Sequence, residues 1–472
     1  MSVKTIMPRS AEAQMGARAL IAVAVSILSG VFARMLGFHA AQQILAASIF
    51  ALIISATVFF WNFRLAIAFI GIAILLGARV LSLEEMVRFA ELDIILFLVG
   101  MMTMVGVLKD LGLFTWVIQI VINMRRMNGW TFTIVLGLIS ALMACVMDEV
   151  TSILFVLALV FQVCDTLKLN PMPFVMIAVI STNIGSSGTM LGNPVGILIG
   201  TKAGFGFADF LIWATPVMLV SLLVAMAVVL IFYKKEIRLL SERLEARRQM
   251  QLGLGPLVRV PFRRGLVILI TAITFIGLHH RIELALGVAK NTMLIVAPLA
   301  IAGVLMIYRH KRARHYIESE VEWWTLLFFM MLFSVAGALE NTGVTAGIAE
   351  RFSRFFGHNV TVLTPLILVM TALGSAFVDN IVFVAAFIPI VKSLGETPLW
   401  WALLFGACFG GNITAIGSTA NIVALGMMEK RYRTQGTFAA WLKFGVLIGV
   451  VTCGVAWLAI LLLTPFMPPV GR

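Results

Sequence analysis

The sequence predicts an all-α polytopic membrane protein with about eleven transmembrane helices, arranged as two inverted repeats. Hydrophobic residues make up 61% of the chain and charged residues only 12%, which leaves no room for a large soluble domain. Several apolar runs also reach the roughly 20 residues that cross a bilayer. Finally, two polar, glycine-rich runs, 181–194 and 410–421, interrupt apolar segments in corresponding halves of the chain.

The first half begins with four apolar runs, which predict spans near residues 17–33, 42–60, 62–81 and 92–108. A shorter apolar segment, 113–124, ends at Arg125 and Arg126 and is typical of a helix lying at the membrane interface. We then expect 131–162 to form two short helices of a re-entrant hairpin, because Asp148 and Glu149 interrupt it. A broken helix at 172–203 and a span at 207–232 complete this half.

The second half repeats this plan after a hydrophilic linker. Its spans are predicted near residues 266–280, 286–307, 322–339 and 438–463. A hairpin at 361–394 is interrupted by Asp379 and Asn380, and a broken helix is expected at 398–427. Local identities support a duplication, since one offset places Asp148 on Asp379 and a slightly different offset places Thr189 on Thr414.

This plan divides the chain into four parts: an N-terminal tail with an extra helix at 1–36, a first repeat at 37–232, a basic cytoplasmic linker at 233–264, and a second repeat at 265–472. An odd number of crossings in each repeat gives the two repeats opposite orientations. The positive-inside rule then predicts a cytoplasmic N-terminus in the inner (plasma) membrane, with basic loops at 125–126, 309–314 and 430–433 inside. Arg351, Arg354 and Lys392 fall outside and do not follow the rule.

The formal charge of +13 does not indicate nucleic-acid binding, because the basic residues occupy short connections between apolar spans. The four cysteines lie in or beside apolar segments without CxxC spacing, so we interpret them as core-filling thiols. We expect membrane lipid and a small ion as partners, and we leave a homodimer open. We expect neither a metal nor another cofactor.

The chemistry is predicted to reside at the two hairpin tips and the two broken helices. Breaks at membrane depth line cavities, where free backbone N–H groups attract anions and free carbonyl groups coordinate cations. Side chains of the breaks and tips complete the predicted ion-binding set, which is Asp148, Glu149, Thr151, Asn183, Ser187, Thr189, Asn193, Asp379, Asn380, Asn412, Thr414, Ser418 and Asn421.

Two interpretations of the tip aspartates stay open. Asp148 and Asp379 cap the returning helices of their hairpins, or they cap and also bind the coupling ion, a proton or a sodium ion at the tips. Glu149 is either a second buried acid or faces a polar channel. Because Gly196 stands where the second half has Asn421, we expect the second break to supply more side-chain ligands and the first more backbone.

The tip and break sequences resemble the ion transporter superfamily. The segments that carry this resemblance are Met147-Asp148-Glu149-Val150-Thr151-Ser152, Phe377-Val378-Asp379-Asn380-Ile381, Gly188-Thr189-Met190-Leu191-Gly192-Asn193-Pro194 and the run from Gly410 to Asn421. They are most similar to the branch of ArsB-type arsenite permeases and the pink-eyed-dilution (P protein) family. NhaD-type sodium/proton antiporters and dicarboxylate/sodium symporters are more distant.

The resemblance covers roughly residues 90–460. It implies scaffold and transport subdomains and an elevator-type displacement of the hairpins and broken helices. Two departures matter: relatives commonly have Asp-Asn where this chain has Asp148-Glu149, and Pro-x-Asn or Pro-Asn at Pro194-Val195-Gly196. The first departure adds a titratable group, which favours proton coupling.

We therefore predict a secondary active transporter, with arsenite or antimonite efflux coupled to protons as the first hypothesis. The alternatives are a sodium/proton antiporter and a symporter of dicarboxylate or sulfate-type anions. Gly200-Thr201-Lys202 lacks the order of a P-loop, so ATP is not expected to drive transport. An enzyme is not expected either, because no histidine or metal-spaced partner accompanies the acid pair.

Overall fold

The computed structural model describes residues 9–122, 124, 127–250, 261–357, 359–432 and 438–469. Every regular element within these ranges is helical, which confirms the predicted all-α class. Arg125, Arg126, Arg433 and residues 251–260 of the predicted linker lie outside the described residues. The chain forms two compact units, of which the first contains residues up to 92, 323–357 and 385–394, and the second contains the remainder.

Among the described residues, the first unit contains six complete α-helices: α1 (Arg9–Met35), α2 (Ala41–Phe59), α3 (Arg64–Gly77), α4 (Leu83–Phe89), α18 (Trp323–Asn341) and α19 (Val344–Phe356). The guanidinium of Arg64 lies over the rings of Trp61 and Phe328, at 3.8 and 4.9 Å from their centroids. A capping box starts α4, in which the Ser82 backbone N–H donates to the Glu85 carboxylate at 2.8 Å. This bond holds the pKa of Glu85 below its usual value.

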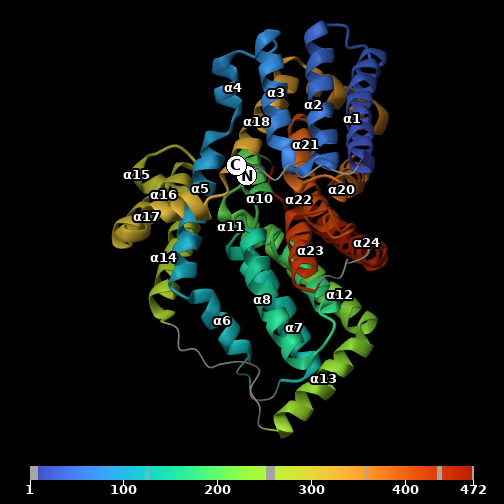
Figure 1. The fold of residues 1–472 in the computed structure, drawn as a ribbon. Helices are drawn as coiled ribbons and strands as arrows, with labels where there is room; N and C mark the ends of the chain where they lie inside the picture. The colour runs from blue at the N-terminus through green and yellow to red at the C-terminus, as the bar shows by residue number, and fades with distance from the viewer. Residues whose placement is uncertain are drawn as a thin grey trace, which may run out of the picture. The chain divides into compact units, whose positions relative to one another are not determined.

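The second unit begins with the helices that carry the first candidate motifs. They are α5 (Leu92–Asp110, in this unit from Asp93), α6 (Leu113–Ile122), α7 (Gly129–Val146), α8 (Glu149–Leu167), α9 (Met172–Gly185), α10 (Pro194–Ala203), α11 (Phe207–Asp209), α12 (Thr215–Phe232) and α13 (Lys234–Gln249). In Figure 1, α7 and α8 lie side by side as a hairpin.

The later helices of the second unit carry the second set of motifs. They are α14 (Arg263–Gly277), α15 (His279–Leu286), α16 (Thr292–Tyr308), α17 (Ala313–His315), α20 (Val360–Ser375), α21 (Asn380–Leu394, divided between the units after Val384), α22 (Thr397–Gly410), α23 (Thr419–Tyr432) and α24 (Phe438–Leu463). The helices α20 and α22 pack against each other, as do α7 and α9. The hairpins and the broken helices are therefore packed together within this unit.

Hydrophobic length identifies the membrane-spanning helices. Among the described residues, eight helices are long and apolar enough to cross a membrane, and ten if each of two sharply bent helix pairs forms one span. The polytopic membrane class is thus confirmed, whereas the count of about eleven stays a prediction. The helices α7 and α8 have 18 and 19 residues, each long enough to cross on its own, so a re-entrant first hairpin also stays a prediction.

The predicted basic linker begins as a helix. In α13, the side chains of Ile237, Leu240 and Leu244 are buried, and the charged residues cover the other faces. The start of α7 lies directly against it, because the Gly129 backbone N–H donates to the Ser241 hydroxyl at 2.8 Å. A Cβ at position 129 would lie 2.1 Å from the Ile237 carbonyl oxygen, so only glycine permits this approach.

Candidate functional site

The first hairpin tip joins α7 to α8 through Met147 and Asp148. Asp148 is the N-cap of α8, and its carboxylate accepts the Thr151 backbone N–H at 2.8 Å. Such a cap satisfies one of the free N–H groups at a helix start. Thr151 thus contributes its backbone to the cap. The capping role of Asp148 is observed directly, and an additional role in ion binding stays a prediction.

The second hairpin tip, between α20 and α21, is tied to the broken helix beside it. One oxygen of Asp379 accepts the Ile381 backbone N–H at 3.1 Å, and the other accepts the Thr419 hydroxyl at 3.4 Å. The Ser375 hydroxyl donates to the Asn380 side-chain oxygen and lies 2.6 Å from the Ala407 carbonyl oxygen. This tip therefore contacts both α22 and the start of α23.

Each polar run interrupts a helix, as its glycines and polar residues predict. The first break, residues 186–193, separates α9 from α10, and the second break, residues 411–418, separates α22 from α23. Both breaks dock on a hairpin tip in the same way, because the Thr189 hydroxyl donates to the Cys145 carbonyl and the Thr414 hydroxyl donates to the Ala376 carbonyl. The two predicted threonines thus fasten each break to the end of α7 or α20.

The helices that lead into the breaks approach the hairpins backbone to backbone. A Cβ on Gly185, the last residue of α9, would lie 2.4 Å from the Cα of Ala141. A Cβ on Gly410, the last residue of α22, would lie at the same 2.4 Å from the Cα of Ala372. Both positions need glycine because a side chain would overlap the facing backbone.

Asn183, near the end of α9, joins the first broken helix to the second. Its side-chain amide donates to the side-chain oxygens of Asn412 and Asn421, at 2.9 and 3.0 Å. Its own side-chain oxygen lies 3.0 Å from the Ser418 hydroxyl oxygen, whose single hydrogen is shared with the Asn421 oxygen. All four side chains are buried. One residue near the end of α9 thus contacts three residues of the second broken helix.

The first break has a comparable side-chain network around Asn193, which includes two residues outside the predicted set, Ser186 and Cys408. The Asn193 amide donates to the Ser186 hydroxyl at 2.9 Å and to the Cys408 sulfur at 3.2 Å, while its oxygen accepts the Gly196 backbone N–H at 2.8 Å. Cys408 is a buried free thiol, as a core-filling cysteine would be, but it also contacts the first break. The offset that places Thr189 on Thr414 also places Asn183 on Cys408, and this signal could have identified it.

The structure therefore brings most of the predicted residues into one network within the second unit. Ser187 is the exception among the hydroxyls, because its side chain donates locally to the Ile184 carbonyl at 2.7 Å. The sequence analysis missed four residues with contacts in this network, Ser186, Ser375, Cys408 and Thr419. Within the described ranges, no three His, Cys, Asp or Glu side chains group closely enough to hold a metal ion.

Two buried polar atoms of the predicted set have no hydrogen-bond partner among the described residues, Glu149 Oε2 and Asn412 Nδ2. Glu149 is 9% exposed and Asn412 is fully buried. The Glu149 carboxyl interacts electrostatically with those of Asp148, Asp379 and Glu322. A buried polar atom without a partner is uncommon in folded proteins, so each one requires an explanation.

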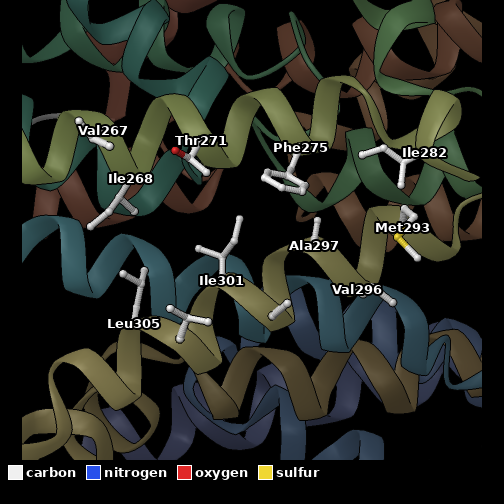
Figure 2. Close-up of a pocket in the computed structure, with 12 residues that line it drawn as sticks. Val267, Ile268, Thr271, Phe275, Ile282, Met293, Val296, Ala297, Ile301 and Leu305 are labelled. Atoms are coloured by element: carbon white, nitrogen blue, oxygen red, sulfur yellow. The ribbon is translucent and has the colours of Figure 1, made fainter.

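Two pockets differ in whether they border the predicted site. A small pocket of about 10 Å³, the space that one water needs, borders Asp148, Asn193 and Pro194 together with α5 side chains. A larger pocket of about 360 Å³ lies between α14, α15 and α16, and Figure 2 shows Thr271 and Phe275 facing Ala297 and Ile301 across it. Its lining is apolar apart from Thr271 and contains none of the predicted ion-binding residues. It is therefore a poor site for an ion.

The chain is similar to several known transporters. The model of the citrate transporter family CitMHS matches residues 50–406. An uncharacterized transporter of Mycobacterium bovis is 35% identical over 376 residues, which are 77% of this chain and 84% of the relative. The human P protein is 26% identical over 511 residues, covering 92% of this chain and 59% of the P protein.

A solved structure shares the fold. The crystal structure of the Alcanivorax borkumensis YdaH transporter superposes with a TM-score of 0.52 at 17% sequence identity, covering 82% of this chain and 88% of the other. At this identity the similarity concerns the fold alone.

Proposed function

The chain belongs to the CitMHS citrate transporter family and is a membrane transporter of that type; on this premise we propose that it is a secondary active transporter of a small ion. Transport proceeds by an elevator-type displacement of the hairpins and broken helices, as the resemblance to the ion transporter superfamily implies. All the predicted ion-binding residues belong to the second compact unit, which supports a single substrate site carried by these elements.

One observation carries the proposal: the two broken helices meet through the Asn183 amide, and α8, which packs against both α9 and α23, begins with a buried glutamate whose Oε2 has no hydrogen-bond partner among the described residues. Broken helices inside a packed bundle leave backbone and amide groups for a ligand. A buried carboxylate is costly within a membrane span and is usually functional. A purely structural bundle requires neither feature.

The substrate proposed first is arsenite or antimonite, exported in exchange for protons. The predicted site offers amides, hydroxyls and carboxyls, and none of its side chains carries a positive charge. Arsenous acid is uncharged and hydroxylated at neutral pH, so its hydroxyl groups can donate to a carboxylate and its oxygens can accept from an amide. A fully ionised tricarboxylate would instead be repelled by Asp148, Glu149 and Asp379.

A carboxylate or sulfate-type anion is the second candidate, because the matching family is described by citrate. Such a substrate would enter as a protonated species or as a complex with a cation, which lowers its repulsion by the tip acids. Sodium/proton exchange is the remaining alternative, since the three carboxyls at the tips attract cations. The coupling ion is accordingly a proton or sodium, and Glu149 favours the proton.

Flux into proteoliposomes tests these candidates directly. Purified protein is reconstituted and supplied with labelled arsenite, antimonite, citrate, sulfate or sodium, under an imposed pH gradient or an imposed sodium gradient. Accumulation of arsenite or antimonite that follows the pH gradient supports the first candidate. Accumulation of citrate or sulfate alone, or of sodium alone, replaces it with the corresponding alternative.

The proposed location is the plasma membrane, with the N-terminus in the cytoplasm. The cluster from Arg309 to Arg314 then lies inside, as the positive-inside rule requires. Lys311 is exposed, so a Lys311→Cys variant should resist an impermeant thiol reagent in intact cells and react after permeabilisation. Ready labelling in intact cells would reverse the orientation.

A further inference from the structure

The amide of Asn421 is fully occupied inside the protein. Its nitrogen donates to the Gly411 and Thr414 carbonyl oxygens, at 2.7 and 2.8 Å. Its oxygen accepts from Asn183 and from Ser418, at 3.0 and 2.7 Å. A side-chain amide has two donors and two acceptor sites, so Asn421 retains no hydrogen bond for a ligand. Asn421 therefore stabilises the backbone of the second break and is not a direct substrate contact.

Counting hydrogen bonds in the same way excludes other residues of the predicted set as direct contacts of a ligand. The Asn193 amide donates to Ser186 and Cys408, and its oxygen caps α10. The hydroxyls of Thr189 and Thr414 donate to hairpin carbonyls and accept the backbone N–H groups of Leu191 and Ile416. These side chains stabilise the breaks, because their polar atoms form hydrogen bonds within the breaks and to the neighbouring helices.

Glu149 Oε2 and Asn412 Nδ2 remain after this accounting. Thr182 Oγ1 is also unpartnered, but it belongs to a neutral hydroxyl inside α9 and not to a tip or a break. One of the two atoms is an acceptor and the other is a donor, so together they suit a solute that both donates and accepts.

Neighbouring residues fix the orientation of Asn412. Its side-chain oxygen is held by the Asn183 amide at 2.9 Å, and its main-chain oxygen accepts the Trp441 indole N–H at 3.1 Å. With Oδ1 engaged, the Nδ2 hydrogens must point elsewhere, into a region where the described residues offer no acceptor. Asn183 therefore positions the donor of Asn412.

The helix that Glu149 begins, α8, packs against α23, which directly follows the break that contains Asn412. The Cys408 thiol, in the last turn of α22 directly before that break, also interacts with the Glu149 carboxyl. The other groups that act on it are the carboxyls of Asp148 on its own tip, Asp379 on the second tip and Glu322 before α18. All of these groups are acids, so none of them stabilises a negative charge on Glu149.

We propose that Asn412 Nδ2 and Glu149 Oε2 are the direct side-chain contacts of an uncharged, hydroxylated solute, and that this solute and a proton compete for Glu149. Asn183 is a positioning residue that acts through Asn412. The inference rests on the proposed function and names the atoms and the substrate class of that site.

Competition at the Glu149 carboxylate links release of the solute to uptake of a proton. When Glu149 is ionised, it accepts a hydrogen bond from a hydroxyl of the solute, and a charge-assisted bond of this kind is about twice as strong as a neutral one. When Glu149 takes up a proton, that bond is lost and the solute is released. The proton leaves again on the opposite side as the next solute binds.

Arsenite binding to the purified full-length protein tests the proposal, measured by isothermal titration calorimetry in mildly alkaline and mildly acidic buffer. Acidification should weaken wild-type binding by about tenfold. Glu149→Gln should bind with the same weak affinity at both pH values. Asn412→Asp retains the acceptor for Asn183 and removes the donor, so it should weaken binding by about tenfold at both pH values.

Two further variants serve as controls. Thr182→Val removes an unpartnered hydroxyl outside the proposed contacts and should bind like the wild type. Asn183→Ala should weaken binding in the wild type but add no further loss to Asn412→Asp, because it acts through Asn412. Additive losses would assign Asn183 a general structural role and overturn its positioning role.

The outcomes distinguish a failure of the assigned contacts from a failure of the proposed function. If the wild type binds and transports arsenite but Glu149→Gln keeps the pH dependence, or Asn412→Asp binds normally, the assigned contacts are wrong and the proposed function stands. If the wild type binds no arsenite at either pH and its liposomes accumulate another substrate, the uncharged solute and the contacts assigned to it are both overturned.

Discussion

The two hairpin tips have similar sequences and different contacts. Asp379 and Asn380 are tied to neighbouring elements through Thr419 and Ser375. At the first tip, the Asp148 cap stays within its own helix, and Glu149 retains a carboxylate oxygen without a partner among the described residues. The second tip has an amide, Asn380, where the first has an acid, Glu149. Only the first tip therefore adds a carboxylate that is available to a ligand.

The largest expected effect comes from removing the acid of the second tip. Asp379→Asn should abolish proton-coupled transport, by at least about tenfold, while leaving expression largely intact, because the coupling charge is lost and an amide oxygen can still cap. Flux in proteoliposomes under a pH gradient measures this. Full activity would exclude a coupling role for Asp379.

Making the two tips alike is expected to flatten the pH dependence of transport and, because Glu149 is a proposed substrate contact, to lower the transport rate as well. Glu149→Asn gives the first tip the Asp-Asn pair of the second and removes the titratable group, so the pH profile of transport should flatten. Asn380→Gln, which adds no acid, is the matched control. An unchanged profile in Glu149→Asn would make Glu149 a structural residue.

Substituting alanine for Gly185 and for Gly410 tests how tightly each broken helix packs against the facing hairpin. Gly185→Ala and Gly410→Ala each place a Cβ 2.4 Å from facing backbone, so each should lower the free energy of unfolding by about 1–3 kcal/mol. Thermal unfolding in detergent measures both. Because the geometry matches, a large effect at one position only would contradict equal packing of the two breaks.

The smallest effect is expected at the paired threonines. Thr189→Val and Thr414→Val each remove one hydrogen bond between a break and a hairpin, at a cost of about 1 kcal/mol. The same unfolding measurement applies, and Thr182→Val serves as the control because its hydroxyl has no partner among the described residues. Unequal losses in the two variants would indicate that one break is held mainly by other contacts.

Hydrophobic length and interruption predicted much of the fold. The apolar runs gave the all-α class, and the acids and glycines marked the tips and breaks near where α8, α10, α21 and α23 begin. These features depend on residues close together in the chain, so periodicity and composition reveal them. The helical start of the linker, α13, was not anticipated because its charge indicated only a solvated segment.

The state of each candidate side chain could not be predicted in this way. Whether Asn421 is free or saturated depends on Asn183, more than 200 positions earlier in the sequence. The sequence identifies an amide, but only the folded partners determine whether its hydrogen bonds remain available. The second break was expected to supply more side-chain ligands than the first. We now propose only Asn412 as such a ligand, because the hydrogen bonds of Asn421 are used within the protein.

The hydrogen bond from Trp441 to the Asn412 main-chain oxygen gives the second break an intrinsic optical reporter. Trp441 is one of ten tryptophans and is fully buried. The emission of an indole changes with its hydrogen bonding and local polarity, so movement at Asn412 should alter the fluorescence of this residue. The difference between the emission spectra of the wild type and of Trp441→Phe would isolate that signal. It would allow movement of the break to be followed in time without any added label.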